Sequence, residues 1–149
     1  MISRPTTAQL IGVVRRELAE TVAPAVDDPV VAGSLMMIDH LLGTFAQRAE
    51  HEIAWMLEEI DEIRELAERV ARELPDAAGV TEPLTHELAS MRLSDVVEHY
   101  SAVSEALSRA LEATLATDSL LHGAVVDLLH TRLAHEQEVI GDFQLVGRG

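Results

Sequence analysis

The sequence predicts an all-α protein, a helical bundle of four main helices with one unusually long central helix. Between Pro29 and Leu74, apolar residues recur at steps of three and four, which keeps one face of a helix against its neighbours. No stretch shows the period-two alternation of a strand. Aromatic residues make up only 3% of a chain that is 48% apolar, so Leu, Val, Ile and Ala must build the core. The apolar line of the long helix comprises Val31, Leu35, Ile38, Leu42, Phe45, Ala49, Ile53, Met56, Ile60, Ile63, Ala67, Val70 and Leu74.

A first, shorter helix precedes the long one. Thr6 and Gln9 have the spacing of a capping box, in which each side chain bonds the other residue's backbone amide. The helix is expected to run to about Val22 and to end at Pro24. Its inner face would carry Leu10, Ile11, Val14, Leu18 and Val22.

The long helix begins and ends at recognisable signals. Asp28 followed by Pro29 is typical of an N-cap and first helical residue, and Pro75 closes the helix. A helix of about 46 residues would span about 69 Å at 1.5 Å per residue, more than a small domain covers, so self-association or a partner is expected if it is straight. Two successive four-residue steps, from Phe45 to Ile53, form a stutter, and Gly43 marks a potential break.

Two further long helices follow a loop marked by Gly79 and Pro83. A short helix is expected over residues 84–91, and Ser94-Asp95 is expected to cap the third long helix. Asp118 would open the last helix, which precedes a frayed tail at residues 147–149. The stripe of the third helix is Val96, Tyr100, Val103, Leu107, Leu111 and Leu115, and that of the last is Leu121, Val125, Leu128, Leu129, Leu133 and Ile140.

Composition limits the partners. The 149 residues suffice for one domain, expected over 1–149, and carry a net charge of −15 from 26 acidic and 11 basic residues. This charge repels nucleic acid and anionic membranes and favours a protein with a basic face. No apolar run approaches the ~18 residues of a membrane span, and no signal peptide is evident, so we expect a soluble, cytoplasmic protein. The absence of cysteine excludes disulfides and thiolate chemistry.

One face of the long helix carries candidate binding residues beside the apolar line. Arg48, His51, the only tryptophan (Trp55) and Glu58 follow one another at steps of three and four. Trp and Arg are the residues most often central to protein interfaces, so this face is the predicted partner-binding surface. The neighbouring acidic run from Glu58 to Glu68 is interpreted as a solvated helix face, with a docking surface for a basic partner as the alternative.

A repeated pattern suggests an alternative site. Arg48-x-x-His51-Glu52 recurs in the last helix as Arg132-x-x-His135-Glu136, and both glutamates fall on lines expected to face inward. Either each arginine neutralises the glutamate four residues later, which we favour, or His51, Glu52, His135 and Glu136 form a metal or acid–base site inside a ferritin-like bundle. No Glu-x-x-His motif is present, the nearest being Asp127-x-x-His130, so we expect no metal or other cofactor.

The first third of the chain resembles a family of small bacterial helical proteins of unknown function. The resemblance rests on residues 4–11, 16–18 and 22–26, where a Pro-Thr start leads to a Val-x-Pro end, and on residues 51–56, which resemble an actinobacterial branch. Members tend to be encoded beside a phosphotransferase-fold kinase and an acyl-CoA dehydrogenase. One branch resembles the small accessory subunit of a 4-hydroxyacyl-CoA kinase of levulinate-type catabolism. The longer central helix and the Arg/His/Glu pairs depart from that family.

The resemblance implies a non-catalytic accessory subunit that supports a phosphotransferase-family kinase in acyl-CoA and hydroxy-acid catabolism. The chain contains no Gly-rich phosphate loop, nucleophile elbow or His-Glu-x-x-His motif, so we expect no enzyme activity of its own. A ferritin-like metal-binding bundle or enzyme is one alternative. A homodimeric structural protein, in which the long helix pairs with its own copy, is another.

Overall fold

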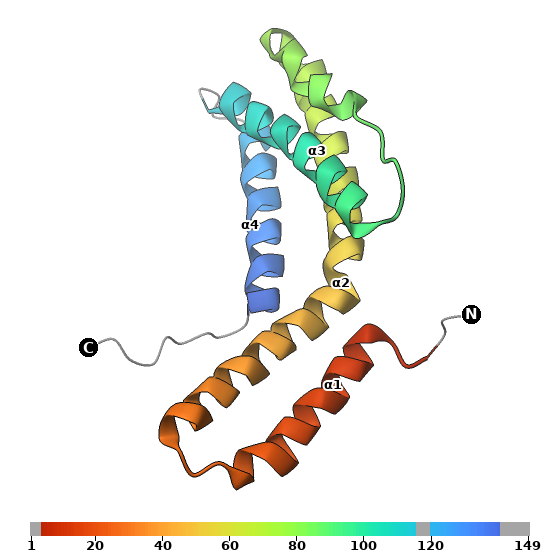
Figure 1. The fold of residues 1–149 in the computed structure, drawn as a ribbon. Helices are drawn as coiled ribbons and strands as arrows, with labels where there is room; N and C mark the ends of the chain where they lie inside the picture. Colours follow the sequence, from red (N-terminus) through yellow and green to blue (C-terminus); the bar gives the residue numbers. More distant parts are fainter. Residues whose placement is uncertain (1–3, 116–119, 141–149) are drawn as a thin grey trace. The chain divides into compact units, whose positions relative to one another are not determined.

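The computed structural model describes residues 4–115 and 120–140, and every regular element in these ranges is helical. The central helix α2, Pro29–Glu73, runs for 45 residues and continues through Gly43 (Figure 1). The predicted all-α class with one long central helix is therefore confirmed.

The chain divides into two compact units, which are described separately. The first comprises residues 1–52 and 137–149, and the second residues 53–136. Helix α2 contributes to both units. The expectation of one domain over residues 1–149 stays a prediction.

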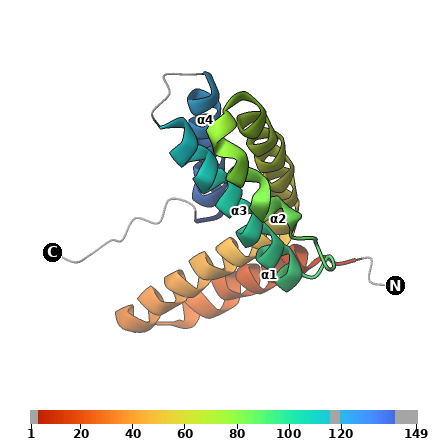
Figure 2. The same ribbon diagram turned by 90° about the horizontal axis from the view of Figure 1, so that it is seen from above.

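The first unit contains a helical hairpin. Helix α1, Thr7–Glu17, begins with the predicted capping box, in which Thr6 N donates to Gln9 Oε1 at 2.9 Å and Gln9 N donates to Thr6 Oγ1 at 3.2 Å. A π turn (Leu18–Val22) and a 3₁₀ turn (Ala23–Ala25) follow. Asp28 then caps α2, accepting from the amide of Val30 at 2.8 Å as predicted. Helix α1 runs antiparallel beside the N-terminal part of α2 (Figures 1 and 2).

The apolar residues of this hairpin are largely uncovered. Among the described residues before Glu59, none is buried. Several predicted inner positions are wrong, because only one side of each helix meets the other in a two-helix hairpin. Ile11, Leu18, Leu35 and Leu42 are half-buried, whereas the following are exposed: Leu10, Val14, Val22, Val31, Ile38 and Phe45.

The second unit has a true core, because the C-terminal part of α2 packs with three further elements. These are the 3₁₀ segment Pro75–Thr85, α3 (Leu93–Thr114) and α4 (Leu120–Ile140) (Figures 1 and 2). The side chains of Ile63, Val70, Val96, Val103 and Val125 are fully buried. Arg109 fastens the 3₁₀ segment to α3, because its Nη1 donates to the carbonyl of Gly79 at 2.7 Å.

Some predicted local elements of the second unit are wrong. The expected helix over residues 84–91 is absent, because the 3₁₀ segment before it ends at Thr85 and the chain then runs without helix to Arg92. Helix α3 begins one residue before Ser94, with Arg92 as an N-cap that lacks a side-chain bond. Leu115 and Leu133 are exposed. Asp118 and residues 147–149 lie outside the described residues.

Helix α2 is also long and apolar enough, by length and composition, to cross a membrane. An 18-residue window near its N-terminal end has a mean hydropathy of 1.3, and none of that window is buried. Signal sequences and core helices of soluble proteins pass the same test, although a core helix is mostly buried. This part of α2 is therefore an apolar segment that is not buried.

Candidate functional site

A buried carboxylate forms the centre of a polar cluster in the second unit. The side chain of Glu59, on α2, is only 6% exposed. Its Oε1 lies 2.7 Å from Nδ1 of His135, and its Oε2 accepts a hydrogen bond from the Tyr100 hydroxyl. The guanidinium of Arg132 pairs with Glu59 through Nε, 3.2 Å from Oε2. Both oxygens of the carboxylate are therefore bound by side chains of the protein.

Arg132 connects α4 to α3 within this cluster. Its Nε donates to the Tyr100 oxygen at 2.8 Å, and its Nη2 donates to Ser104 Oγ at 3.2 Å. The guanidinium carbon lies 4.9 Å from the centre of the Tyr100 ring, a cation–π contact. Tyr100 and Ser104 are four residues apart on one helix, so one arginine can bind both.

Burial and the neighbouring carboxylate keep Tyr100 protonated. Burial raises its pKa, the hydrogen bond to Glu59 raises it further, and the positive charge of Arg132 opposes the rise, leaving a pKa of about 12. The hydroxyl therefore remains a hydrogen-bond donor to Glu59 over the physiological pH range.

The predicted binding residue Trp55 lies at the rim of this cluster. Its ring stacks on His135, with centroids 4.6 Å apart and planes within 2° of each other. Both side chains are partly exposed. Trp55 thus presents one apolar surface at the point where α2 meets α4.

The other predicted binding residues are placed differently. Glu58 is exposed in the second unit, and Arg48 and His51 belong to the first unit. Arg48 Nε donates to Glu52 Oε1 at 2.9 Å, which is the ion pair predicted for the i, i+4 spacing. The Arg48 side chain is 49% exposed and that of Glu52 18%, so this pair lies nearer the surface than Glu59 and Arg132.

In the alternative site, His51 and Glu52 belong to the first unit and His135 and Glu136 to the second. Glu136 is exposed, so its predicted inward direction is wrong. The physical reason is that α4 turns the line Leu121, Val125, Leu128, Arg132 and His135 towards its neighbours, and Glu136 lies about 100° away from His135. Within residues 4–115 and 120–140, no three His, Asp or Glu side chains are grouped to hold a metal ion.

Sequence reasoning missed Glu59, the central residue of the cluster. It was assigned to the acidic, solvated run of α2, although it is buried. A usable signal was present, because Glu59 precedes Ile63, Leu66 and Val70 at steps of four, three and four and therefore shares their buried line. His135, a residue of the alternative site, pairs with Glu59.

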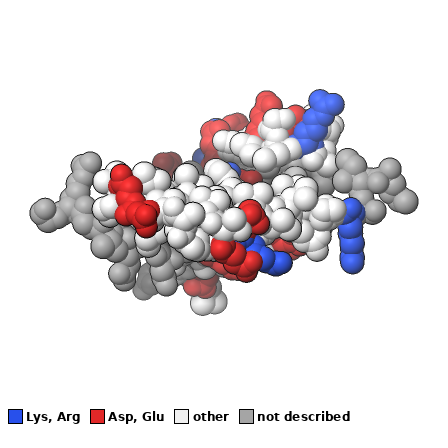
Figure 3. All heavy atoms as spheres, turned by 60° about the horizontal axis from the view of Figure 1, so that its bottom comes forward, with Lys and Arg blue, Asp and Glu red and all other residues white. Residues whose placement is uncertain are grey.

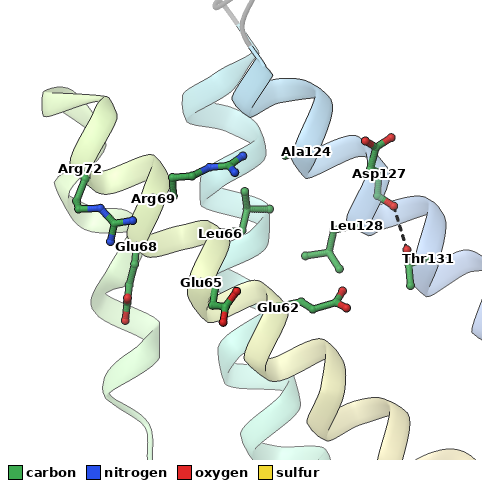
Figure 4. Close-up of a pocket in the computed structure, with 10 residues that line it drawn as sticks. All are labelled: Glu62, Glu65, Leu66, Glu68, Arg69, Arg72, Ala124, Asp127, Leu128 and Thr131. Carbon is green, nitrogen blue, oxygen red and sulfur yellow. Dashed lines mark hydrogen bonds between the residues drawn. The ribbon is translucent and has the colours of Figure 1, made fainter.

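A second feature of this unit is an acidic groove between α2 and α4. Its volume is about 570 Å³, and Figure 4 shows charged side chains of α2 on one side and Asp127 with Thr131 on the other. Leu66 and Leu128 supply apolar surface. Arg69 lines the groove, and its Nε is buried without a hydrogen-bond partner. The remaining lining residues are Glu62, Glu65, Glu68, Arg72 and Ala124.

Comparisons with known proteins found no relative of this chain. No family model matches this chain, and no match was found among curated proteins or solved structures.

Proposed function

We propose that this chain is a non-catalytic accessory subunit that binds a phosphotransferase-family kinase acting on acyl-CoA hydroxy acids. The observation that carries the non-catalytic part is the satisfied state of the Glu59 cluster. A carboxylate that accepts from Tyr100, pairs with Arg132 and lies against His135 links three helices, and this supports a structural role for the cluster. The choice of kinase rests on the sequence resemblance of residues 4–26 and 51–56.

The second unit supplies surfaces suited to such a partner. Trp55 is partly exposed and held in one orientation by its stack on His135, which reduces the conformational entropy lost on binding. The groove between α2 and α4 carries Glu62, Glu65, Glu68 and Asp127 and fits a partner segment with Lys or Arg side chains. A net charge of −15 would also speed the approach of a basic face.

The test is co-expression with a kinase-fold protein encoded beside this chain. The two proteins should co-purify, and the kinase activity should rise, whereas the isolated chain should show no phosphotransfer, hydrolase or redox turnover. Trp55→Ala should weaken the association by at least about 2 kcal/mol, roughly thirtyfold. Turnover by the isolated chain would contradict the proposal.

Charge reversal separates the groove from the rest of the acidic surface. Glu62→Lys with Asp127→Lys should slow association and weaken binding, whereas Glu112→Lys, an exposed residue of α3 outside the groove, should have little effect. Circular dichroism of each variant checks that the helices persist. Equal losses from the groove and control variants would show that only the overall charge matters.

A further inference from the structure

The hairpin of the first unit exposes a large number of apolar side chains. Eleven large apolar side chains in it are between 36% and 75% exposed. Scattered exposed residues are normal, but a contiguous set requires an explanation. The eleven are Leu10, Val13, Val14, Val22, Val30, Val31, Met36, Met37, Ile38, Leu41 and Phe45.

The line along which the two helices meet is given by half-buried residues. These are Ile11, Arg15 and Leu18 from the first segment and Leu35, Asp39 and Leu42 from α2. Arg15 Nε donates to Asp39 Oδ1 at 2.8 Å and its Nη2 to Oδ2 at 2.9 Å, so a two-bond ion pair fixes this contact.

The exposed apolar residues form a stripe on one side of the hairpin. At 100° per residue, Leu10 and Val14 lie about 80° from the meeting line on α1. Four residues of α2 lie about 80° from it in the same rotational sense: Val31, Ile38, Leu41 and Phe45. Because the two helices are antiparallel, equal rotation in the same sense brings both sets to the same side. Met36 lies on the other side of α2.

On α2 this stripe carries no charged side chain other than a paired one. On α1, exposed Glu17 follows Leu10 and Val14 at steps of four and three and lies on the same side. Between Pro29 and Gln47 the only Asp, Glu, Lys or Arg is Asp39, which is paired with Arg15. Figure 3 shows acidic and basic side chains interspersed with uncharged ones on the face that comes forward from the bottom of Figure 1. A second chain of the same net charge of −15 therefore meets no like charge along the α2 part of this face, and Glu17 lies at the C-terminal end of the α1 part.

We propose that a second copy of this chain covers the stripe, so that two α1/α2 hairpins form a four-helix bundle about a two-fold axis. The stripe and its neighbours Val13, Val30 and Met37 are nine large apolar side chains that are each about half exposed. At about 100 Å² for a fully exposed side chain, they offer roughly 500 Å² of apolar surface. A stable interface buries about 800 Å² per partner, of which about 60% is apolar, so the areas agree. An apolar stripe is also self-complementary, as a two-fold interface requires.

A lipid surface is the competing occupant, since the same segment passes the length and hydropathy test for a membrane span. The net charge of −15 opposes binding to anionic membranes, and the hairpin places a half-exposed ion pair beside the stripe. A second copy of this chain therefore fits the stripe better than a lipid surface does. The dimer surface lies in a different unit from the surfaces proposed to bind a kinase, so either proposal can fail without the other.

Light scattering after size-exclusion chromatography tests the dimer on the full chain. The native protein should show twice the chain mass of 16.3 kDa. The double variant Leu41→Glu with Phe45→Glu should reduce the mass to 16.3 kDa. The control variant Met36→Glu introduces the same charge at an exposed residue on the other side of α2 and should leave the dimer intact. A monomeric native protein, or identical masses for both variants, would overturn the proposal.

Cross-linking keeps the test decisive if the double variant fails to fold. The chain contains no cysteine, so Ile38→Cys and Met36→Cys each introduce a single thiol. A short bismaleimide should yield a covalent dimer several-fold more efficiently with Ile38→Cys. Equal yields, or a native protein that is monomeric in solution and sediments with phosphatidylcholine vesicles, would reject the second copy as occupant.

Discussion

The two units use the same kind of apolar helix in opposite ways. In the second unit, α2 meets α3, α4 and a 3₁₀ segment, and Ile63, Ala67 and Val70 have no exposed surface. In the first unit, α2 runs beside α1 over the described residues, and Ile38 and Phe45 of the same apolar line are 44% and 51% exposed. Burial is thus decided by the number of neighbouring helices, and a periodic apolar line alone does not ensure it.

The ion pairs of the two units differ in the same way. Glu59 and Arg132 of the second unit have side chains 6% and 21% exposed, whereas Arg15 and Asp39 of the first are both 41% exposed. A buried charge that loses its partner costs far more than an exposed one, because water cannot replace the partner. The second unit should therefore be sensitive to single polar substitutions, and the first should tolerate them.

The largest expected effect is the loss of Arg132. Arg132→Ala removes the ion pair to Glu59 and the bonds to Tyr100 and Ser104, and should lower the free energy of unfolding by about 3–5 kcal/mol. Arg48→Ala is the matched control in the first unit and should cost only ~0–1 kcal/mol, since its side chain is 49% exposed. Urea denaturation followed by circular dichroism measures both. Similar losses in the free energy of unfolding for the two variants would contradict the expected difference between the units.

Tyr100 provides a spectroscopic test of the same cluster. It is the only tyrosine, so absorbance near pH 12 reports this residue alone. The folded protein should ionise it with a pKa of about 12, against about 10 in the unfolded chain. Because folding favours the neutral phenol, its contribution to stability is fully present below pH 10 and is lost as the pH rises through 12.

Glu59→Gln refines this measurement. The variant removes the negative charge but leaves the phenol buried, so the pKa of Tyr100 should fall towards 10 without reaching it. A folded native protein that titrates near pH 10 would contradict the burial of Tyr100.

Acid should destabilise the protein through His99, by less than the substitution of Arg132 does. Burial lowers its pKa below 6.5, and positive charge on His86 and Arg64 lowers it further. The unfolded chain therefore binds the proton more readily, so the contribution of neutral His99 is present above about pH 6.5 and is lost as the pH falls. Denaturation midpoints at pH 7.5 and 5.5 measure the loss. His99→Gln should reduce it, whereas His130→Gln, on an exposed residue of α4, should not.

Much of the fold was predictable because its signals are local. The capping box of Thr6, the Asp28 cap and the long period of α2 follow from contacts within one turn or from a repeated spacing. The helix expected over residues 84–91 failed, because the 3₁₀ segment held by Arg109 stops at Thr85 and the chain then leaves helical geometry. Tertiary contacts of this kind leave no local pattern.

The site was predictable only in part, for the same reason. Trp55 and His135 were singled out from residue type and spacing, and the structure stacks them. Their connection to Glu59 depends on which side of α4 turns inward, and Leu129, Leu133 and Glu136 formed an equally plausible line in the sequence. Packing against α2 and α3 selected the other line, with Arg132 and His135.

The smallest expected effect tests the ion pair of the first unit. A side chain at Gly43 would place its Cβ 3.2 Å from Arg15 Nη1, whereas Gly33 has nothing within 4 Å. Gly33→Ala should therefore stabilise by the full helix preference of alanine, about 0.8–1 kcal/mol. Gly43→Ala should gain less, because Arg15 must shift from Asp39 and weaken a half-exposed pair worth ~0–1 kcal/mol. Urea denaturation at one fixed protein concentration compares the two. Equal gains would show that the Arg15–Asp39 pair adds nothing to the hairpin, and that its two helices are held together by apolar contact alone.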